Sequence, residues 1–190
     1  MSMQMNHSTY LGQGNCVCCT ELPKPTQTRR HFLKLSGAAS LAMFAPQFVQ
    51  AASGDYEAML LSCIDPRFQK PVFENEAKQG MTGKYSAFTI AGGSIGVVAP
   101  AFKDWHETFW QNLDASVNLH NIKKVIVINH RDCGAAKIAY GEAAVATPAV
   151  ETETHKNALL TFKSQLAVRQ PKLSSTLGLM ALDGSIETFS

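Results

Sequence analysis

Short apolar runs alternate with longer amphipathic stretches from about residue 52 onward. Four runs have the length and composition of β-strands, namely residues 58–61, 85–91, 125–128 and 177–182. The third run is Val125-Ile126-Val127-Ile128. It shows no polar alternation, which is typical of a strand covered on both faces in a parallel sheet. The pattern predicts an α/β fold with a mostly parallel central sheet of about four strands, flanked by helices.

One amphipathic stretch lies between the second and third strand runs. Asp104 and Glu107 have the spacing of a capping box, so we expect a helix to begin at Asp104. Trp110 falls off the apolar stripe of this helix and is expected to face a partner subunit. The residues of the stripe recur at every fourth position: Trp105, Phe109, Leu113 and Val117.

A second helix is expected over residues 154–169, because Leu159, Phe162 and Leu166 share one side and Pro171 lies just beyond the end. The chain contains no internal repeat and no low-complexity tract. Residues 52–190 are therefore expected to form a single domain.

The charge of the chain is unevenly distributed. The whole sequence has 17 Lys and Arg against 15 Asp and Glu. Residues 1–51 hold four of the basic residues and one of the acidic ones, which leaves 13 basic and 14 acidic residues beyond them. The body therefore has a net charge of −1, which gives no electrostatic footprint for nucleic acid.

The leader carries the segment Thr28-Arg29-Arg30-His31-Phe32-Leu33-Lys34. It resembles a twin-arginine export signal. The apolar run that follows is ~15 residues long, shorter than the ~20 that a membrane-spanning helix needs. Val49-Gln50-Ala51 then has the small residues of a cleavage site. We expect export to the periplasm by the Tat machinery, with residues 1–51 as leader; the alternative is an ordinary amphipathic first helix.

The leader also holds a cysteine cluster, Cys16, Cys18 and Cys19. This cluster lacks the ligand spacing of a structural zinc site and would be lost on cleavage. We assign it no role.

Only Cys63 and Cys133 remain in the body of the chain. Each directly follows a predicted strand, and His130 lies three residues before Cys133. The carboxyl ends of strands in an open parallel sheet are where ligands gather. Two thiolates and one imidazole would hold a tetrahedral zinc ion with one open position, as in catalytic zinc sites. The alternative is a Cys63–Cys133 disulfide with a surface histidine.

The motifs Cys63-x-Asp65-x-Arg67 and His130-x-x-Cys133-Gly134 together resemble those of the β-class carbonic anhydrases. The resemblance covers about residues 57–189, nearly all of the body. It implies one zinc ion per chain on Cys63, His130 and Cys133, with Asp65 and Arg67 as a catalytic dyad. It also implies a homodimer or higher homo-oligomer with active sites near the subunit interface, to which Trp110 and residues 92–96 are expected to contribute.

The chemistry of these residues can also be derived directly. Zinc lowers the pKa of its water to about 7, so hydroxide becomes available to attack carbon dioxide. Asp65 can accept the hydrogen bond of the hydroxide, and Arg67 can hold Asp65 away from the metal. Without Arg67, Asp65 could occupy the fourth position and close the site.

Two positions depart from the family pattern. Asn129 stands where a glycine usually precedes the histidine, and Gly93 stands where the family has the asparagine of Ala-Gly-Asn. Both departures concern the wall of the pocket, so they bear on the choice of substrate more than on zinc binding.

Several features have ordinary interpretations. Residues 92–96 are rich in glycine but lack the spacing and the lysine of a phosphate-binding loop. His106, His120 and His155 are interpreted as solvated or as satisfied within the core. Glu151 and His155 lie one helical turn apart, an arrangement that is common on solvated faces.

Three functions remain open from the sequence. The first is reversible hydration of carbon dioxide to bicarbonate by a zinc enzyme. The second is hydrolysis of carbonyl sulfide or carbon disulfide on the same zinc site. The third is a non-catalytic zinc-binding or redox protein, which the presence of the complete Cys, His, Asp and Arg set argues against.

Overall fold

The computed structural model describes residues 54–190. The twin-arginine segment and Cys16, Cys18 and Cys19 lie outside the described residues. Along the described chain the elements are β1 (Ala58–Ser62), α2 (Pro66–Lys78), β2 (Tyr85–Thr89), α3 (Ser94–Val98), η1 (Pro100–Phe102), α4 (Lys103–His120), β3 (Lys124–His130), α5 (Gly134–Tyr140), η2 (Glu142–Val145), α6 (Pro148–Arg169), β4 (Ser174–Met180) and β5 (Ile186–Phe189).

The strands form one five-stranded sheet in the order β2-β1-β3-β4-β5. Strands β2, β1, β3 and β4 run parallel, and β5 pairs antiparallel with β4. The predicted α/β fold with a mostly parallel sheet is confirmed. The short edge strand β5 was not predicted, because Ile186–Phe189 has neither the length nor the apolar content of the other strands.

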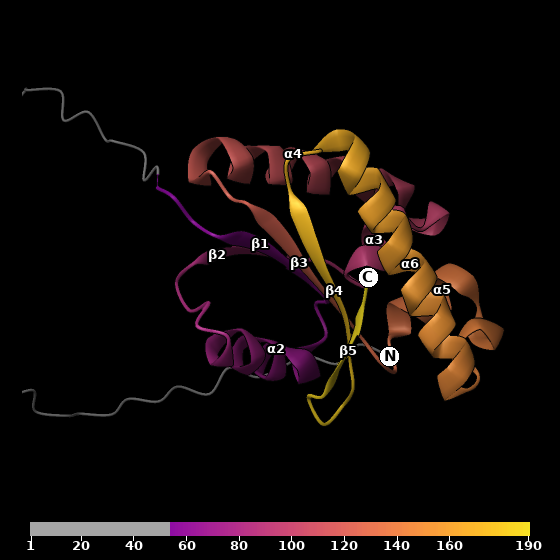
Figure 1. Cartoon of the computed structure of the whole chain (residues 1–190). Helices are drawn as coiled ribbons and strands as arrows, with labels where there is room; N and C mark the ends of the chain where they lie inside the picture. The colour runs from indigo at the N-terminus through magenta and orange to yellow at the C-terminus, as the bar shows by residue number, and fades with distance from the viewer. Residues whose placement is uncertain (1–53) are drawn as a thin grey trace, which may run out of the picture. The chain divides into compact units, whose positions relative to one another are not determined.

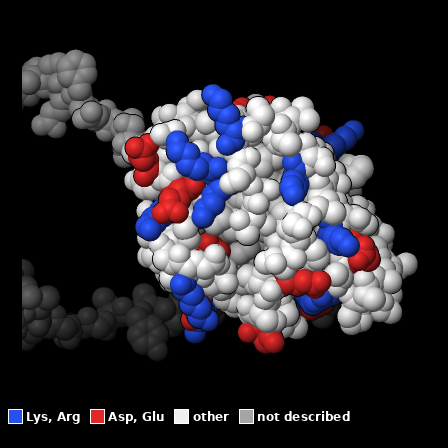
Figure 2. Space-filling model, viewed as in Figure 1, with Lys and Arg blue, Asp and Glu red and all other residues white. Residues whose placement is uncertain are grey.

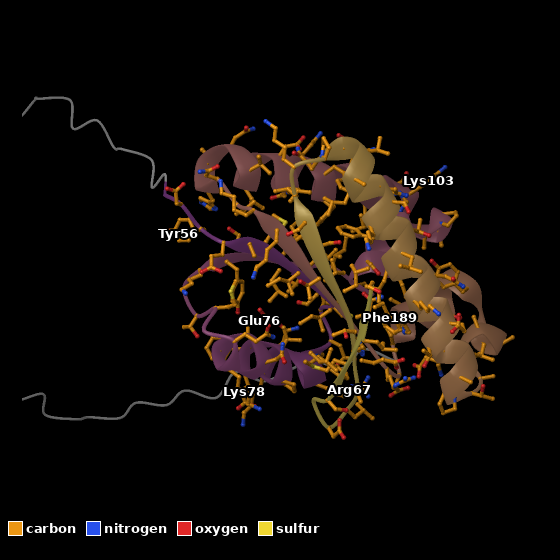
Figure 3. All side chains as sticks on the ribbon, in the orientation of Figure 1. Tyr56, Arg67, Glu76, Lys78, Lys103 and Phe189 are labelled. Carbon is orange, nitrogen blue, oxygen red and sulfur yellow. The ribbon has the colours of Figure 1, made fainter. Side chains whose placement is uncertain are left out.

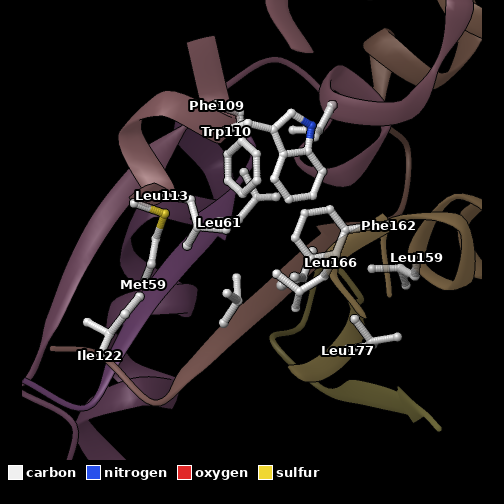
Figure 4. Close-up of a cluster of buried hydrophobic side chains, with 13 residues drawn as sticks. Met59, Leu61, Phe109, Trp110, Leu113, Ile122, Leu159, Phe162, Leu166 and Leu177 are labelled. Atoms are coloured by element: carbon white, nitrogen blue, oxygen red, sulfur yellow. The ribbon is translucent and has the colours of Figure 1, made fainter. Parts of the chain in front are cut away.

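The sheet has helices on both faces (Figure 1). Every residue of β1 is buried, and β3 is buried from its second residue onward. Alternate residues of these strands therefore contribute to two cores. One core packs the sheet against α4 and α6 (Figure 4), and the other packs it against α2.

The connections leave the two central strands in opposite directions. The chain passes from β1 into α2 on one face, whereas it passes from β3 into α5 and α6 on the other face (Figure 1). Two adjacent parallel strands with diverging connections open a crevice beyond their carboxyl ends. This crevice between β1 and β3 is the place where the fold offers a ligand site.

Helix α4 begins differently from the sequence prediction. Helix α4 begins at Lys103 after Phe102, and no side chain caps it, so the capping box of Asp104 and Glu107 is wrong. The 3-10 helix Pro100–Phe102 leads directly into α4, so the chain enters α4 from an existing helical turn and not from a capping residue.

The two tryptophans of α4 have roles opposite to those predicted. Trp110 is 2% exposed and stacks on Phe162 of α6 with a ring-centroid distance of 5.7 Å, so it does not face a partner subunit. Trp105 is 39% exposed. An i+4 stripe rotates by about 40° per step around a helix with 3.6 residues per turn, which carries Trp105 out of the core.

The last helix, α6, begins at Pro148 rather than at residue 154. Pro148 occupies the first helical position, and the side chain of Thr147 caps the helix by accepting a hydrogen bond from the backbone N–H of Val150. Among residues 54–190, no helix has the long apolar stretch needed to cross a bilayer. Basic and acidic side chains are interspersed on the face shown in Figure 2.

Candidate metal centre

Three metal-binding side chains meet in the crevice between β1 and β3. Cys63 directly follows β1, His130 is the last residue of β3, and Cys133 is the residue before α5. The register of the two strands pairs Ser62 with Ile128, which brings the segments after them side by side. One donor atom from each of the three side chains lies within 4.8 Å of the other two, and all three side chains are buried.

The ring of His130 is held in one orientation. Its Nδ1 donates a hydrogen bond to the carbonyl oxygen of Arg131 at 2.8 Å, and Phe68 of α2 stacks on the ring with centroids 4.0 Å apart. Because Nδ1 carries the proton, Nε2 presents a lone pair. This Nε2 is buried and has no hydrogen-bond partner among the described residues. Such an atom fits a metal ligand.

Both cysteines are free thiols in the structure, so the alternative of a Cys63–Cys133 disulfide is wrong. Hydrogen bonding from Cys133 lowers the pKa of Cys63 to about 4, and the backbone N–H of Gly92 also donates to the Cys63 sulfur at 3.2 Å. The interaction with Cys63, together with burial, raises the pKa of Cys133. A cation between the sulfurs would stabilise both as thiolates, which is the donor set that zinc prefers.

Asp65 and Arg67 form a bidentate pair at the start of α2 (Figure 3 labels Arg67). Asp65 caps the helix by accepting from the backbone N–H of Arg67 at 2.9 Å, and Arg67 Nη2 donates to Asp65 Oδ2 at 2.7 Å. The side-chain hydrogen bond from Arg67 lowers the pKa of Asp65 to about 2. Asp65 Oδ2 lies 4.0 Å from Nε2 of His130. An ionised carboxylate therefore borders the three donors.

Asp132 is part of this arrangement, although no sequence pattern selected it. Its carboxylate accepts a hydrogen bond from Arg67 Nη1 at 2.8 Å, and its carbonyl oxygen accepts from Arg67 Nη2 at 3.1 Å. Asp132 has a φ of 57°, in the left-handed region that few residues other than glycine adopt. The position of Asp132 between His130 and Cys133 was visible in the sequence, but this unusual turn was not.

An apolar cavity of about 390 Å³ opens beside the donors. Trp105 lines it and stacks on Phe102, with ring centroids 4.4 Å apart. Ile64 and Ile138 also line the cavity and are 58% and 73% exposed. The mouth of the centre therefore combines an apolar wall with exposed apolar side chains.

The two departures from the family pattern face each other. A Cβ atom at Gly93, whose φ is 58°, would lie 2.7 Å from Oδ1 of Asn129. The asparagine oxygen occupies the space that a side chain at position 93 would need, and it accepts hydrogen bonds from the backbone N–H and the hydroxyl of Ser94. The departures are thus sterically complementary. Residues 92–96 are buried within the chain, so the prediction that a partner must cover them is wrong.

The other predicted residues lie apart from the donors. His106 pairs with the carbonyl oxygen of Ala99, and His120 pairs with the hydroxyl of Ser86. His155 is fully buried, and burial lowers its pKa to about 4. Glu151 is also buried, so the interpretation of Glu151 and His155 as a pair on a solvated face is wrong.

The sequence was compared with known families and proteins. The family profile described as "Putative carbonic anhydrase" matches residues 54–164, more than half of the chain. The chain belongs to this family. Two relatives are described as uncharacterized proteins. The one from Rickettsia bellii is 30% identical over 68% of this chain and 79% of its own length. The one from Rickettsia conorii is 28% identical over 68% of this chain and 69% of its own length.

Solved structures of β-carbonic anhydrases share the fold. The carbonic anhydrase of Streptococcus mutans is 16% identical with a TM-score of 0.50, over 85% of this chain and 92% of that one. The β-carbonic anhydrase CcaA is 15% identical with a TM-score of 0.52, over 72% and 81%. A tetrameric β-carbonic anhydrase of Sordaria macrospora is 13% identical with a TM-score of 0.50, over 74% and 83%.

Proposed function

We propose that this protein is a zinc-dependent carbonic anhydrase, which converts carbon dioxide and water reversibly into bicarbonate and a proton. The observation that carries the proposal is the convergence of Cys63, His130 and Cys133 beside the Asp65–Arg67 pair. Membership of the carbonic anhydrase family supports the same reaction.

Zinc is the metal that these donors fit best. Two sulfurs and one imidazole are soft and borderline ligands, which favour zinc over magnesium, calcium or manganese. Three protein ligands leave one position open, as in catalytic zinc sites. When bound there, zinc would lower the pKa of a water molecule to about 7 and supply a nucleophile at neutral pH.

Asp65 and Arg67 orient the reacting water in this proposal. The lowered pKa of Asp65 keeps its carboxylate ionised at neutral pH, so it accepts the hydrogen bond of the nucleophile and aims the lone pair. Its three hydrogen bonds with the Arg67 guanidinium involve both carboxylate oxygens, so they fix the direction of the carboxylate and keep it from moving onto the donors.

The cavity beside the donors suits a small apolar substrate. Phe102, Trp105 and Ile138 provide apolar walls, and Asp65 also lines the cavity. Carbon dioxide has no net dipole and gains little from polar partners before the attack. An apolar wall therefore binds the substrate weakly and holds the charged product less well, which favours release.

The proposal is tested by stopped-flow hydration of carbon dioxide, run beside sulfide release from carbonyl sulfide and carbon disulfide, on purified zinc-loaded protein. We expect fast hydration, one zinc ion per chain and no appreciable sulfide release. Cys63→Ser and His130→Ala should lose the zinc, whereas His120→Ala changes a histidine outside the centre and should keep it. Full zinc in the first two variants, or sulfide release without hydration, would contradict the proposal.

We also propose that the protein is exported by the twin-arginine pathway and acts in the periplasm. The supporting observation is the sequence of the leader, from Arg29 and Arg30 through the short apolar run to Ala51. This pathway carries folded proteins, which is compatible with loading of zinc in the cytoplasm before export.

We further propose that the active form is at least a dimer. Ile64, Trp105 and Ile138 are exposed around the mouth of the cavity, and a second copy of the chain would cover them. The tetrameric form named for the enzyme of Sordaria macrospora concerns that protein and is compatible with this proposal.

A further inference from the structure

Helix α6 contacts the segment that carries the metal donors on both sides of His130. Glu151 and His155 lie one turn apart on this helix and are 8% and 0% exposed. Asn129 directly precedes His130 in the sequence, and its side chain donates a hydrogen bond to Nδ1 of His155 at 3.2 Å. Glu151 contacts the turn after His130. The two residues therefore hold the segment from both sides of the histidine.

The contact of Glu151 is directed at one backbone group. Its Oε1 accepts a hydrogen bond from the backbone N–H of Asp132 at 2.6 Å. Among the described residues, this N–H has no other acceptor. A charged acceptor strengthens such a bond, and an unpaired N–H next to a buried centre costs free energy. Glu151 therefore stabilises the turn at Asp132.

Arg131 does not depend on Glu151 in the same way. Its guanidinium donates to the hydroxyl of Thr152 at 2.7 Å and to Glu187 of β5 at 3.3 Å, and its contact with Glu151 is longer, at 3.4 Å. Arg131 thus keeps other partners without Glu151. Of the two contacts of the Glu151 carboxylate, the bond from the Asp132 N–H is the shorter, at 2.6 Å against 3.4 Å.

The turn at Asp132 also holds Arg67 by accepting hydrogen bonds from its guanidinium. Both the carboxylate and the carbonyl oxygen of Asp132 accept hydrogen bonds from Arg67 Nη atoms. Asp132 presents these two oxygens together with its backbone in the left-handed region, at a φ of 57°. The side chain of Arg67 is 47% exposed, so solvent weakens its pair with Asp65, and the two hydrogen bonds to Asp132 add to the hold on the guanidinium.

We propose that Glu151 is a positioning residue for the reaction: it holds the turn at Asp132, which fixes Arg67, which in turn keeps Asp65 aligned beside the metal donors. The inference rests on the proposed function for its effect on turnover. Its structural content, the coupling of α6 to the Asp65–Arg67 pair, does not depend on the substrate.

The test compares Glu151→Ala and Glu151→Gln with Glu153→Ala, an exposed glutamate on the same helix. Glu151→Ala should keep zinc and lower kcat about 10- to 100-fold with little change in KM, the usual cost of removing an outer partner at a metal site. Glu151→Gln retains an oxygen that can accept from the Asp132 N–H, so it should recover most of the loss. Glu153→Ala should behave as wild type.

Coupling is tested with Asp132→Gly, because glycine tolerates the positive φ and removes only the carboxylate. Asp132→Gly keeps the carbonyl oxygen that also accepts from Arg67, so part of the coupling remains in this variant. If Glu151 acts through Asp132, Glu151→Ala should lower kcat less in the Asp132→Gly background than in the wild type. Additive losses in the double variant would overturn the inference.

Two readouts are independent of activity. Amide hydrogen exchange at Asp132 should be faster in Glu151→Ala and unchanged in Glu151→Gln. The visible spectrum of the cobalt-substituted protein should change in Glu151→Ala, because a released Asp65 can approach the metal. Unchanged exchange and spectrum in Glu151→Ala would overturn the inference even in an active enzyme. If the wild type hydrates no carbon dioxide, the proposed function fails, and changes in both readouts would still support the coupling.

Discussion

The ionisation of Asp65, whose side chain is 17% exposed, is decided by its neighbours. Asp65 borders three buried metal donors and would be expensive to ionise there. The side-chain hydrogen bond from Arg67 outweighs this cost and lowers the pKa of Asp65 to about 2, so the carboxylate stays ionised. The guanidinium itself is held by Asp132. In the proposed reaction, the alignment of Asp65 therefore depends on Asp132 through Arg67.

Arg67→Ala tests the pair at the scale of one residue. The three donors and the backbone N–H that caps α2 on Asp65 remain, so the variant should keep zinc and its fold. We expect kcat to fall about 10- to 100-fold in stopped-flow hydration, because Asp65 is misaligned or closes the site.

Lys70→Ala is the matched control for Arg67→Ala. Lys70 is an exposed cation on the same helix, and within residues 54–190 its one ion pair is with Glu74, so its loss should leave turnover unchanged. If both Asp65→Ala and Arg67→Ala kept wild-type turnover, the pair would have no part in the reaction.

At the scale of elements, helix α2 carries an unusual buried residue. Phe68, Val72 and Glu76 form its buried stripe, and Glu76 is 1% exposed on the side of the helix that faces the sheet (Figure 3). Its Oε1 accepts from the side chain of Asn75, whereas its Oε2 has no partner among the described residues. Burial therefore raises the pKa of Glu76.

The raised pKa predicts a pH dependence of stability. The folded state disfavours the ionised carboxylate, so the contribution of Glu76 is most favourable below its ordinary pKa of 4.5 and is lost as the pH rises through the raised value. Glu76→Gln should therefore raise the free energy of unfolding at pH 8, by about 1 kcal/mol, and change it less near pH 4.5. Urea unfolding at both pH values measures the difference.

Glu74→Gln provides the control on the same helix. Glu74 is exposed, so its substitution should change stability equally little at both pH values. A Glu76→Gln variant that is destabilised more at pH 8 than at pH 4.5 would contradict the assigned direction of the pKa shift.

The sequence predicted the grouping of the three donors better than the residues that support them. Cys63, His130 and Cys133 could be predicted because strand periodicity places their neighbours at the carboxyl edge of a parallel sheet. Helix α2 was not predicted, because Pro71 and Glu76 interrupt its apolar pattern. The contact between Glu151 and Asp132 depends on the packing of α6 against β3, which no local pattern contains.

The helical stripe of α4 illustrates the same limit. Trp110 lies next to Phe109 in the sequence and on an adjoining side of the helix. Whether that side is buried depends on α6, which covers it with Phe162 and lets Arg169 lie over the indole at 4.7 Å. Periodicity gives the centre of a buried stripe, and its width comes from tertiary packing.

At the scale of the whole molecule, export is predicted to require Arg29 and Arg30 together. An Arg29→Lys/Arg30→Lys variant should fail to reach the periplasm, as measured by cell fractionation, because the charge is kept while the twin-arginine pattern is lost. Lys24→Ala changes a charge in the same leader and should leave export intact. Undiminished periplasmic protein in the double variant would refute the twin-arginine interpretation.

Association of two chains is the other prediction at this scale. Burial of Trp110 and of residues 92–96 within the chain removes the surface first expected at the interface, and the exposed side chains around the cavity take its place. Ile138 on α5 is the most exposed of them, at 73%. In a two-fold interface the same patch comes from both chains, so one substitution acts twice.

Ile138→Glu should therefore shift the protein from dimer to monomer in sedimentation at micromolar concentration. Val168→Glu places the same charge on an apolar side chain that is 82% exposed near the end of α6, outside the lining of the cavity, and should leave the dimer intact. Loss of the dimer should also lower turnover, because Trp105 and the rest of the apolar wall would open to water. A wild-type protein that is monomeric and fully active would contradict the dimer proposal. The single chain would then be the complete catalytic unit, and the proposed zinc chemistry would be unaffected.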